Sequence, residues 1–268
     1  MDIKEIEIIG GVGKNGSREP VEKVKLKMGD IVSIVGPTGS GKTEFINDIE
    51  RFANKNTPSN RTVIIDGKTV SEELIGDPSK NPVALITQHT NFLSDLPVSE
   101  FLQVHANIRQ GINTDKIVKD TLEFANQLTG ESIILDNAMT ELSGGQTRSL
   151  LIADAVIIGN SPIILLDEIE NAGIHRTRAL ELLRNYRKIF FFVTHDPRIA
   201  LLSDFRIVMK GGAMQKLIMR GEKEQKVADH IKNIDEVLSD YRAKIREGEE
   251  FDEEGFKKKM KAFGYISQ

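Results

Sequence analysis

Residues 31–43, with the sequence IVSIVGPTGSGKT, decide the fold of this chain. The segment Ile31–Val35 is a largely β-branched run that ends in glycine, which is typical of a strand buried on both faces. The next eight residues fit the pattern G-x-x-x-x-G-K-[ST], and the chain from Lys42 to about Ala53 is expected to be helical. A strand that leads into a glycine-rich loop, followed at once by a helix, is the arrangement that wraps backbone N–H groups around a phosphate.

This loop is predicted to hold the phosphates of a nucleoside triphosphate, and ATP is the expected ligand. The helix N-terminus adds a partial positive charge, Lys42 can reach the β- and γ-phosphates, and the Thr43 hydroxyl can ligate Mg²⁺. The predicted nucleotide-binding residues are Gly36, Pro37, Thr38, Gly39, Ser40, Gly41, Lys42 and Thr43.

The composition is that of an ordinary globular protein, with 39% apolar and 28% charged residues in a chain of 268. A formal net charge of −4 gives no basic footprint, so no nucleic-acid partner is expected. The apolar runs are far shorter than the roughly 18 residues of a membrane-spanning helix, and the first residues do not form a secretory signal. The absence of cysteine excludes disulfides and thiolate metal sites. We expect a cytoplasmic protein, peripheral on the inner face of the membrane if another chain supplies the anchor.

Alternating strand and helix patterns predict an α/β fold with a mainly parallel sheet. The later part of the chain shows this alternation most clearly, with expected helices at 145–157 and 176–185 and expected strands at 83–86, 163–166 and 189–193. Period-two alternation over 3–9 and strand patterns near 21–26 and 61–70 predict further strands.

The stretch between 98 and 142 has a helical pattern with polar faces, so we expect an inserted helical subdomain over about 89–142. Residues 1–220 then form one domain, and 221–268 form a charged helical C-terminal extension. In that extension six apolar residues, spaced alternately by four and three, form a narrow stripe that either packs on the same chain or contacts a partner: Val227, Ile231, Ile234, Leu238, Tyr241 and Ile245.

A second glycine-rich segment, Gly11–Gly16, fits G-x-G-x-x-G, which is nominally a dinucleotide fingerprint. That fingerprint needs its third glycine in an opening helix, but Ser17-Arg18-Glu19-Pro20 follows here. We therefore interpret the segment as a mobile turn.

Two carboxylates, Asp167 and Glu168, follow the apolar run at 163–166. Beside the phosphate-binding strand, Asp167 would enter the Mg²⁺ shell and Glu168 would polarise the attacking water as a general base. Further upstream, Leu142-Ser143-Gly144-Gly145-Gln146 precedes a helix. Ser143 and Gln146 have the spacing of a capping box, and the two glycines also expose N–H groups that can form a second anion site.

Five motifs now stand in the order found in the ATP-binding cassette (ABC) ATPases, and the chain resembles that family over about residues 1–220. They are the phosphate loop, Gln88 after a strand, Leu142–Gln146, Asp167-Glu168, and His195 after the strand at 189–193. The resemblance implies a P-loop ATPase of ABC type that uses ATP and Mg²⁺ and has an antiparallel β subdomain beside the mainly parallel sheet.

The resemblance also implies a head-to-tail dimer, with each ATP between the phosphate loop of one subunit and Ser143, Gly144, Gly145 and Gln146 of the other. It implies that Gln88 contacts Mg²⁺, the attacking water and a partner protein, and that His195 contacts the γ-phosphate and orients Glu168. The implied catalytic residues are Glu168, His195, Lys42 and Gln88, and the implied metal ligands are Thr43, Gln88 and Asp167.

Three departures from the family pattern stand out. No aromatic residue precedes Phe45, so the usual stacking of adenine on an upstream aromatic is missing. The loop after Glu168 has Ile169 and Ile174 where proline and aspartate are usual, and Ser149 stands where arginine is often found, one place after Arg148.

Two functions fit these residues. The first is the nucleotide-binding subunit of an ABC transporter whose membrane subunits are separate chains. The alternative is a non-transport ABC ATPase that remodels or activates a soluble partner, such as a metallocluster-assembly complex. A second copy of the ATPase subunit is expected in either case.

Overall fold

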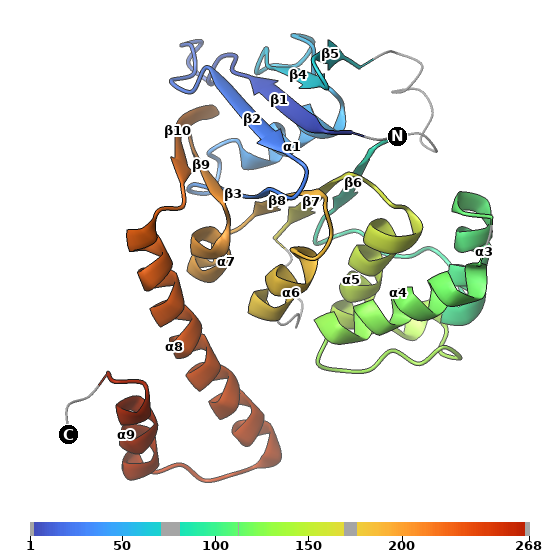
Figure 1. The fold of residues 1–268 in the computed structure, drawn as a ribbon, viewed down its shortest axis with the longest axis vertical. Helices are drawn as coiled ribbons and strands as arrows, with labels where there is room; N and C mark the ends of the chain where they lie inside the picture. Colours follow the sequence, from blue (N-terminus) through green and yellow to red (C-terminus); the bar gives the residue numbers. More distant parts are fainter. Residues whose placement is uncertain (1–2, 71–80, 112, 169–175, 266–268) are drawn as a thin grey trace. The chain divides into compact units, whose positions relative to one another are not determined.

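The computed structural model describes residues 3–70, 81–111, 113–168 and 176–265, and only the backbone of 176–178. Within those ranges the chain divides into two compact units, 1–220 and 221–268 (Figure 1). The first unit contains two sheets and the helices that cover them, and the second is helical.

The larger sheet has six described strands, in the order β10-β9-β3-β8-β7-β6. The neighbours from β9 to β6 run parallel, and β10 joins antiparallel to β9. This is the mainly parallel core that the alternating pattern predicts. The strands are β3 (Ile31–Val35), β6 (Val83–Ile86), β7 (Ile163–Asp167), β8 (Ile189–Val193), β9 (Phe205–Lys210) and β10 (Ala213–Met219).

A smaller antiparallel sheet has the order β2-β1-β4-β5, as predicted for an antiparallel subdomain. Its apolar residues point to one face and its charged residues to the other, where Lys25 binds Glu5 at 2.6 Å and Lys23 binds Glu7 at 2.7 Å. The strands are β1 (Glu5–Ile9), β2 (Lys23–Lys27), β4 (Thr62–Ile65) and β5 (Lys68–Thr69).

Strand β7 shows how the two faces of the parallel sheet are covered. Because side chains alternate along a strand, Ile163 and Leu165 join one core while Ile164 and Leu166 join the other. The first core also contains the buried side of α1 (Lys42–Glu50) and the apolar face of the antiparallel sheet. The second contains residues of the helices α3 (Val98–Arg109), α4 (Thr114–Leu128), α5 (Gly144–Ala153), α6 (Arg176–Leu183) and α7 (Pro197–Leu202).

The expected helical block is present but shorter than the pattern suggests. Helices α3 and α4 account for most of it, and the chain from 129 to 138 is not helical before a 3₁₀ turn at Met139–Glu141. The helix expected at 145–157 is α5 followed by a π-helical turn, Asp154–Ile158. In that turn Asp154 accepts a hydrogen bond from, or pairs with, His105 Nδ1 at 2.7 Å.

The second unit has a 26-residue helix, α8 (Glu222–Glu247), and a shorter one, α9 (Glu253–Ala262). The narrow apolar stripe from Val227 to Ile245 predicts a helix, and all six of its residues lie in α8. Tyr241 of α8 packs on Phe251 and Phe256 with ring centroids 5.2 and 6.0 Å apart, and His230 Nδ1 lies 3.1 Å from Tyr265 Oη. None of the helices in the described ranges is long and apolar enough to cross a bilayer.

Candidate nucleotide site

The phosphate loop connects the end of β3 to the start of α1, and close packing explains two of its glycines. A Cβ on Gly36 would lie 2.3 Å from the Met209 carbonyl oxygen, and one on Gly41 would lie 2.8 Å from Gly212 Cα. Both residues also have positive φ, 154° and 96°, which side-chain-bearing residues rarely adopt. The loop therefore rests directly against the end of β9 and the β9–β10 turn.

Lys42 is the first residue of α1, and its side chain folds back over the loop. Its Nζ donates to the carbonyl oxygens of Gly36, at 2.9 Å, and Pro37, at 3.2 Å, and the residue is only 7% exposed. The residue before the helix, Gly41, provides no side-chain cap for the first N–H groups of α1. A lysine ammonium beside an uncapped helix N-terminus is suited to bind a polyphosphate.

The register of the parallel strands brings the other predicted catalytic residues to the same edge of the sheet. Val193 is paired with both Ile34 and Asp167, and Ile86 is paired with Leu166. Glu168, His195 and Gln88 follow those positions by one or two residues, so all of them lie at the carboxyl edge where the phosphate loop leaves β3. In open α/β sheets this edge is where ligands bind.

Glu168 and His195 come together across neighbouring strands. Their Oε1 and Nε2 atoms are 3.7 Å apart, and both side chains are partly exposed, at 34% and 50%. Glu168 has a left-handed backbone, with φ of 50°, and its N–H donates to the Val193 carbonyl at 3.1 Å. A carboxylate and an imidazole in this arrangement can orient a water and hold its proton.

Gln88 lies two residues beyond β6 and is linked to the helical block. Its backbone carbonyl accepts a hydrogen bond from Arg148 Nη2 of α5, and its Nε2 lies 3.2 Å from His89 Nε2. Arg148 thus joins the Gln88 segment to the helix that begins at Ser143.

Ser143 caps α5 as its spacing with Gln146 predicts. The Gln146 N–H donates to Ser143 Oγ at 3.3 Å, and the Ser143 N–H donates to Gln146 Oε1 at 2.9 Å. Gln146 Nε2 also donates to the Ser132 carbonyl, and Ser143 Oγ to Glu131. Ser143 and Gly144 are exposed, so the start of α5 is open to a further contact.

The segment Gly11–Gly16, interpreted as a mobile turn, is held in the structure by backbone and side-chain bonds. Lys14 Nζ donates to the carbonyl of Gly39 at 2.9 Å, and the Lys14 N–H donates to that of Gly211 at 2.8 Å. A Cβ on Gly11 would lie 2.0 Å from the Ser59 carbonyl oxygen. The turn thus packs against the phosphate loop through Lys14, a contact that no sequence pattern predicts.

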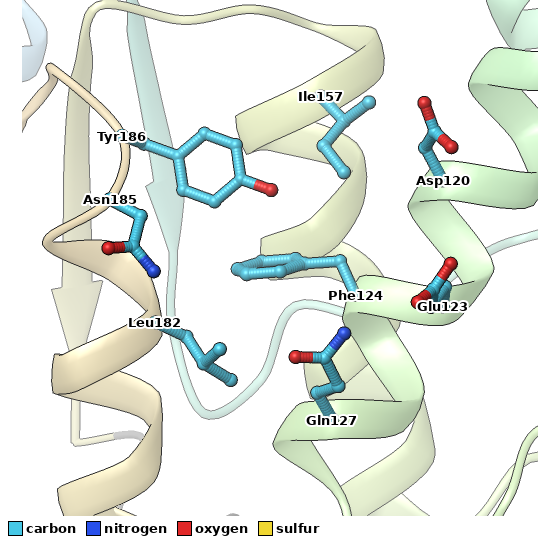
Figure 2. Close-up of a pocket in the computed structure, with 8 residues that line it drawn as sticks. All are labelled: Asp120, Glu123, Phe124, Gln127, Ile157, Leu182, Asn185 and Tyr186. Atoms are coloured by element: carbon cyan, nitrogen blue, oxygen red, sulfur yellow. The ribbon is translucent and has the colours of Figure 1, made fainter.

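The cavity in Figure 2 is separate from these residues. It has a volume of about 410 Å³ and lies between α4, the π-helical turn and the end of α6. Phe124 and Tyr186 meet edge to face in it, with centroids 5.1 Å apart. Burial, and then the negative charge of Asp120, raise the pKa of the Tyr186 hydroxyl.

Two of the sequence expectations cannot be placed. Ile169 and Ile174, in the atypical loop after Glu168, lie outside the described residues. Within the described part of the chain no group of three or more His, Cys, Asp or Glu side chains could hold a metal ion.

Comparison with known proteins gives consistent matches. The family model described as ABC transporter matches residues 22–171. An ABC transporter ATP-binding protein of Methanocaldococcus jannaschii is 50% identical over 249 residues, which cover 93% of this chain and 95% of that one. The spermidine/putrescine import ATP-binding protein PotA of Bacteroides fragilis is 31% identical over 81% of this chain, but the chain spans only 47% of its length.

Among solved structures, the dimeric post-hydrolysis state of an ATP-binding cassette bound to ADP and phosphate has a TM-score of 0.61. It is 23% identical and covers 81% of this chain and 99% of its own. At this level of identity the match concerns the fold alone.

Proposed function

The chain belongs to the ABC transporter family, and from that premise we propose that it binds and hydrolyses Mg-ATP as the nucleotide-binding subunit of an ABC transporter. The observation that supports this most is the alignment of four sequence motifs at one edge of the parallel sheet. The phosphate loop, Gln88, Asp167-Glu168 and His195 follow four neighbouring strands, and the Glu168–His195 distance is 3.7 Å.

Each residue has a role that its position favours. Lys42 and the N-terminus of α1 bind the β- and γ-phosphates and offset their charge. Glu168 accepts a proton from the attacking water as that water approaches the γ-phosphorus. His195, beside Glu168, orients the carboxylate and donates to the γ-phosphate.

The donor set suits magnesium. The Thr43 hydroxyl, the Gln88 amide oxygen and the Asp167 carboxylate are all hard oxygen ligands, and Mg²⁺ takes one or two protein carboxylates together with phosphate oxygens and water. When bound, the ion would neutralise charge on the β- and γ-phosphates. The protein side chains then position the phosphates and the attacking water.

A second copy of the chain would complete the site. Ser143 and Gly144 are exposed at the N-terminus of α5, where Gly144 and Gly145 present backbone N–H groups while the Gln146 N–H donates to Ser143 Oγ. In this arrangement the N-terminus of α5 binds the γ-phosphate of the ATP held by the other subunit. The dimeric ADP-bound cassette to which the fold is similar favours this arrangement.

Membrane subunits are the partners that the relatives favour, since by name the Methanocaldococcus protein is an ABC transporter ATP-binding protein and PotA is a spermidine/putrescine import ATP-binding protein. The comparisons do not favour the soluble alternative. Four exposed apolar side chains follow Gln88 in the sequence and offer a contact surface, which we name the 93–108 surface: Leu93, Leu96, Val104 and Ile108.

The test is steady-state phosphate release by the purified chain and by Glu168→Gln, with Glu123→Gln as the matched control on the exposed side of α4. General-base catalysis contributes about 10²–10⁴-fold, so we expect Glu168→Gln to lose at least a hundredfold in kcat while still binding ATP. Glu123→Gln keeps the wild-type rate. Normal turnover in Glu168→Gln would show that the general base is another group.

A further inference from the structure

A buried ionic cluster, formed by Arg61, Glu19 and Asp48, lies behind the phosphate loop. The side chains are 0%, 0% and 1% exposed. Arg61 Nη2 and Nε bind the two oxygens of Glu19 at 2.6 and 3.1 Å, and Arg61 Nη1 binds Asp48 Oδ2 at 2.7 Å. The guanidinium also lies over the ring of Phe45, 5.1 Å from its centroid.

The cluster ties together segments that are distant in the sequence. Asp48 and Phe45 belong to α1, the helix that starts at Lys42. Glu19 accepts hydrogen bonds from the N–H groups of Gly11, at 2.9 Å, and Met214, at 2.5 Å. The cluster therefore fixes α1, the segment before β2 and the start of β10 against one another.

One contact leads from the cluster to the phosphate loop. Arg61 Nη2 donates to the Gly212 carbonyl at 2.7 Å, and the Gly212 N–H donates to the Ser40 carbonyl at 2.9 Å. Gly212 Cα is also the atom that a Cβ on Gly41 would meet. The β9–β10 turn thus stands between Arg61 and the loop and contacts both.

Burying a charge cluster carries a desolvation cost, and apolar side chains of similar volume often stabilise a core as well or better. What the guanidinium adds is geometry, since its planar fork fixes three acceptors in set directions. Here those acceptors are two carboxylates and the backbone of the turn that supports the phosphate loop.

We propose that Arg61 is a positioning residue for ATP binding: through Gly212 it holds Ser40 and Gly41 in the conformation that receives the phosphates. This rests on the proposed function of the phosphate loop. Arg61 does not touch the nucleotide, and it acts on affinity rather than on the chemical step.

The first test compares Arg61→Lys with Arg184→Lys, measuring Kd for ATP, kcat and thermal unfolding. Lysine keeps the charge of Arg61 but cannot reach all three acceptors. We expect Kd for ATP to rise about tenfold, or about 1.4 kcal/mol, with kcat at saturation within about twofold of wild type. Arg184 is a matched control because it also binds a carboxylate, Asp204 at 3.0 Å, and a backbone carbonyl, that of Leu202.

The second test moves the turn without changing a charge. Gly212→Ala places a Cβ 2.9 Å from Lys14 Cγ, while Gly211→Ala imposes a similar positive-φ strain but meets no atom within 4 Å. We expect Gly212→Ala to weaken ATP binding as Arg61→Lys does, and Gly211→Ala to leave the affinity near wild type.

The proposal is overturned if folded Arg61→Lys binds ATP with the wild-type Kd, or if Arg184→Lys or Gly211→Ala weakens binding equally. A wild-type chain that does not bind ATP would instead refute the proposed function, so the two failures are distinguishable.

Discussion

Glu168 illustrates how a single residue is placed for chemistry. Its left-handed φ of 50° costs energy for a residue with a side chain, and its N–H bond to Val193 helps to hold that conformation. Because the backbone at Glu168 leaves the extended conformation of β7, the side chain does not follow the alternating directions of the strand. Its Oε1 lies 3.7 Å from His195 Nε2. Strain at this position, next to a predicted metal ligand, is consistent with the catalytic role proposed for Glu168.

Lys188 gives a residue-scale prediction about pH. It is 6% exposed, its Nζ donates to Asn160 and Ser161, and burial lowers its pKa from 10.5 to about 8. Between pH 8 and 10.5 the unfolded chain binds more protons at this group than the folded one, so stability attributable to Lys188 rises with pH across that window. Below pH 8 both states carry the proton, and the penalty of the buried charge is constant.

We therefore expect the free energy of unfolding of the wild type, relative to Lys188→Met, to increase by up to roughly 3 kcal/mol from pH 7 to 10.5. Denaturant titrations of both chains at several pH values measure this difference, and other groups cancel because they are common to both. A difference that stays constant across the window would show that the Lys188 pKa is not lowered.

At the scale of the element, the N-terminus of α5 has two separable roles. Ser143 caps the helix through the observed capping box, and its exposed position suits the proposed contact with ATP of a second subunit. Alanine removes the cap, whereas aspartate keeps a cap but adds a negative charge that would repel the γ-phosphate.

We expect Ser143→Ala to lower the free energy of unfolding by about 1 kcal/mol. Ser143→Asp should remain as stable as wild type but lose ATP-dependent dimerisation. Chemical denaturation and sizing chromatography with ATP separate the two effects. If Ser143→Asp still dimerises with ATP, Ser143 only caps α5 and does not contact the ATP of a second subunit.

The strands of the core were predictable because their signals are local. β3, β7 and β8 are apolar runs, and their alignment places the motifs that follow them at one edge. The ionic cluster was not predictable, since Arg61 is separated from Glu19 by 42 residues and from Gly212 by 151. The contact of Lys14 with Gly39, 25 residues apart, was not predictable for the same reason.

At the scale of the whole molecule, the 93–108 surface is where we expect a membrane subunit to bind. Leu93 is fully exposed, and Val104 and Ile108 lie one helical turn apart on α3. We predict that Leu93→Asp combined with Ile108→Asp abolishes co-purification with a polytopic membrane protein while ATP binding is unchanged. The matched control is Ile134→Asp, also exposed but outside this surface.

Detergent extracts of native membranes, with the tagged chain as bait, provide the measurement. If the double variant still retains the membrane protein, the 93–108 surface is not the binding site for a membrane subunit. Recovery of the wild-type chain with a soluble enzyme and no membrane protein would argue for the non-transport alternative.

In the proposed ATPase, the phosphate loop is one half of a site that a second copy of the chain completes. Because the chain has no cysteine, single cysteines can be placed at will. Thr38→Cys and Ser143→Cys, both at exposed positions, are introduced into separate chains that also carry Glu168→Gln. The two chains are mixed and treated with a short thiol cross-linker. We predict a cross-linked heterodimer that forms only with ATP and not in either variant alone. Absence of that cross-link with saturating ATP, or its formation regardless of nucleotide, would contradict the head-to-tail composite site.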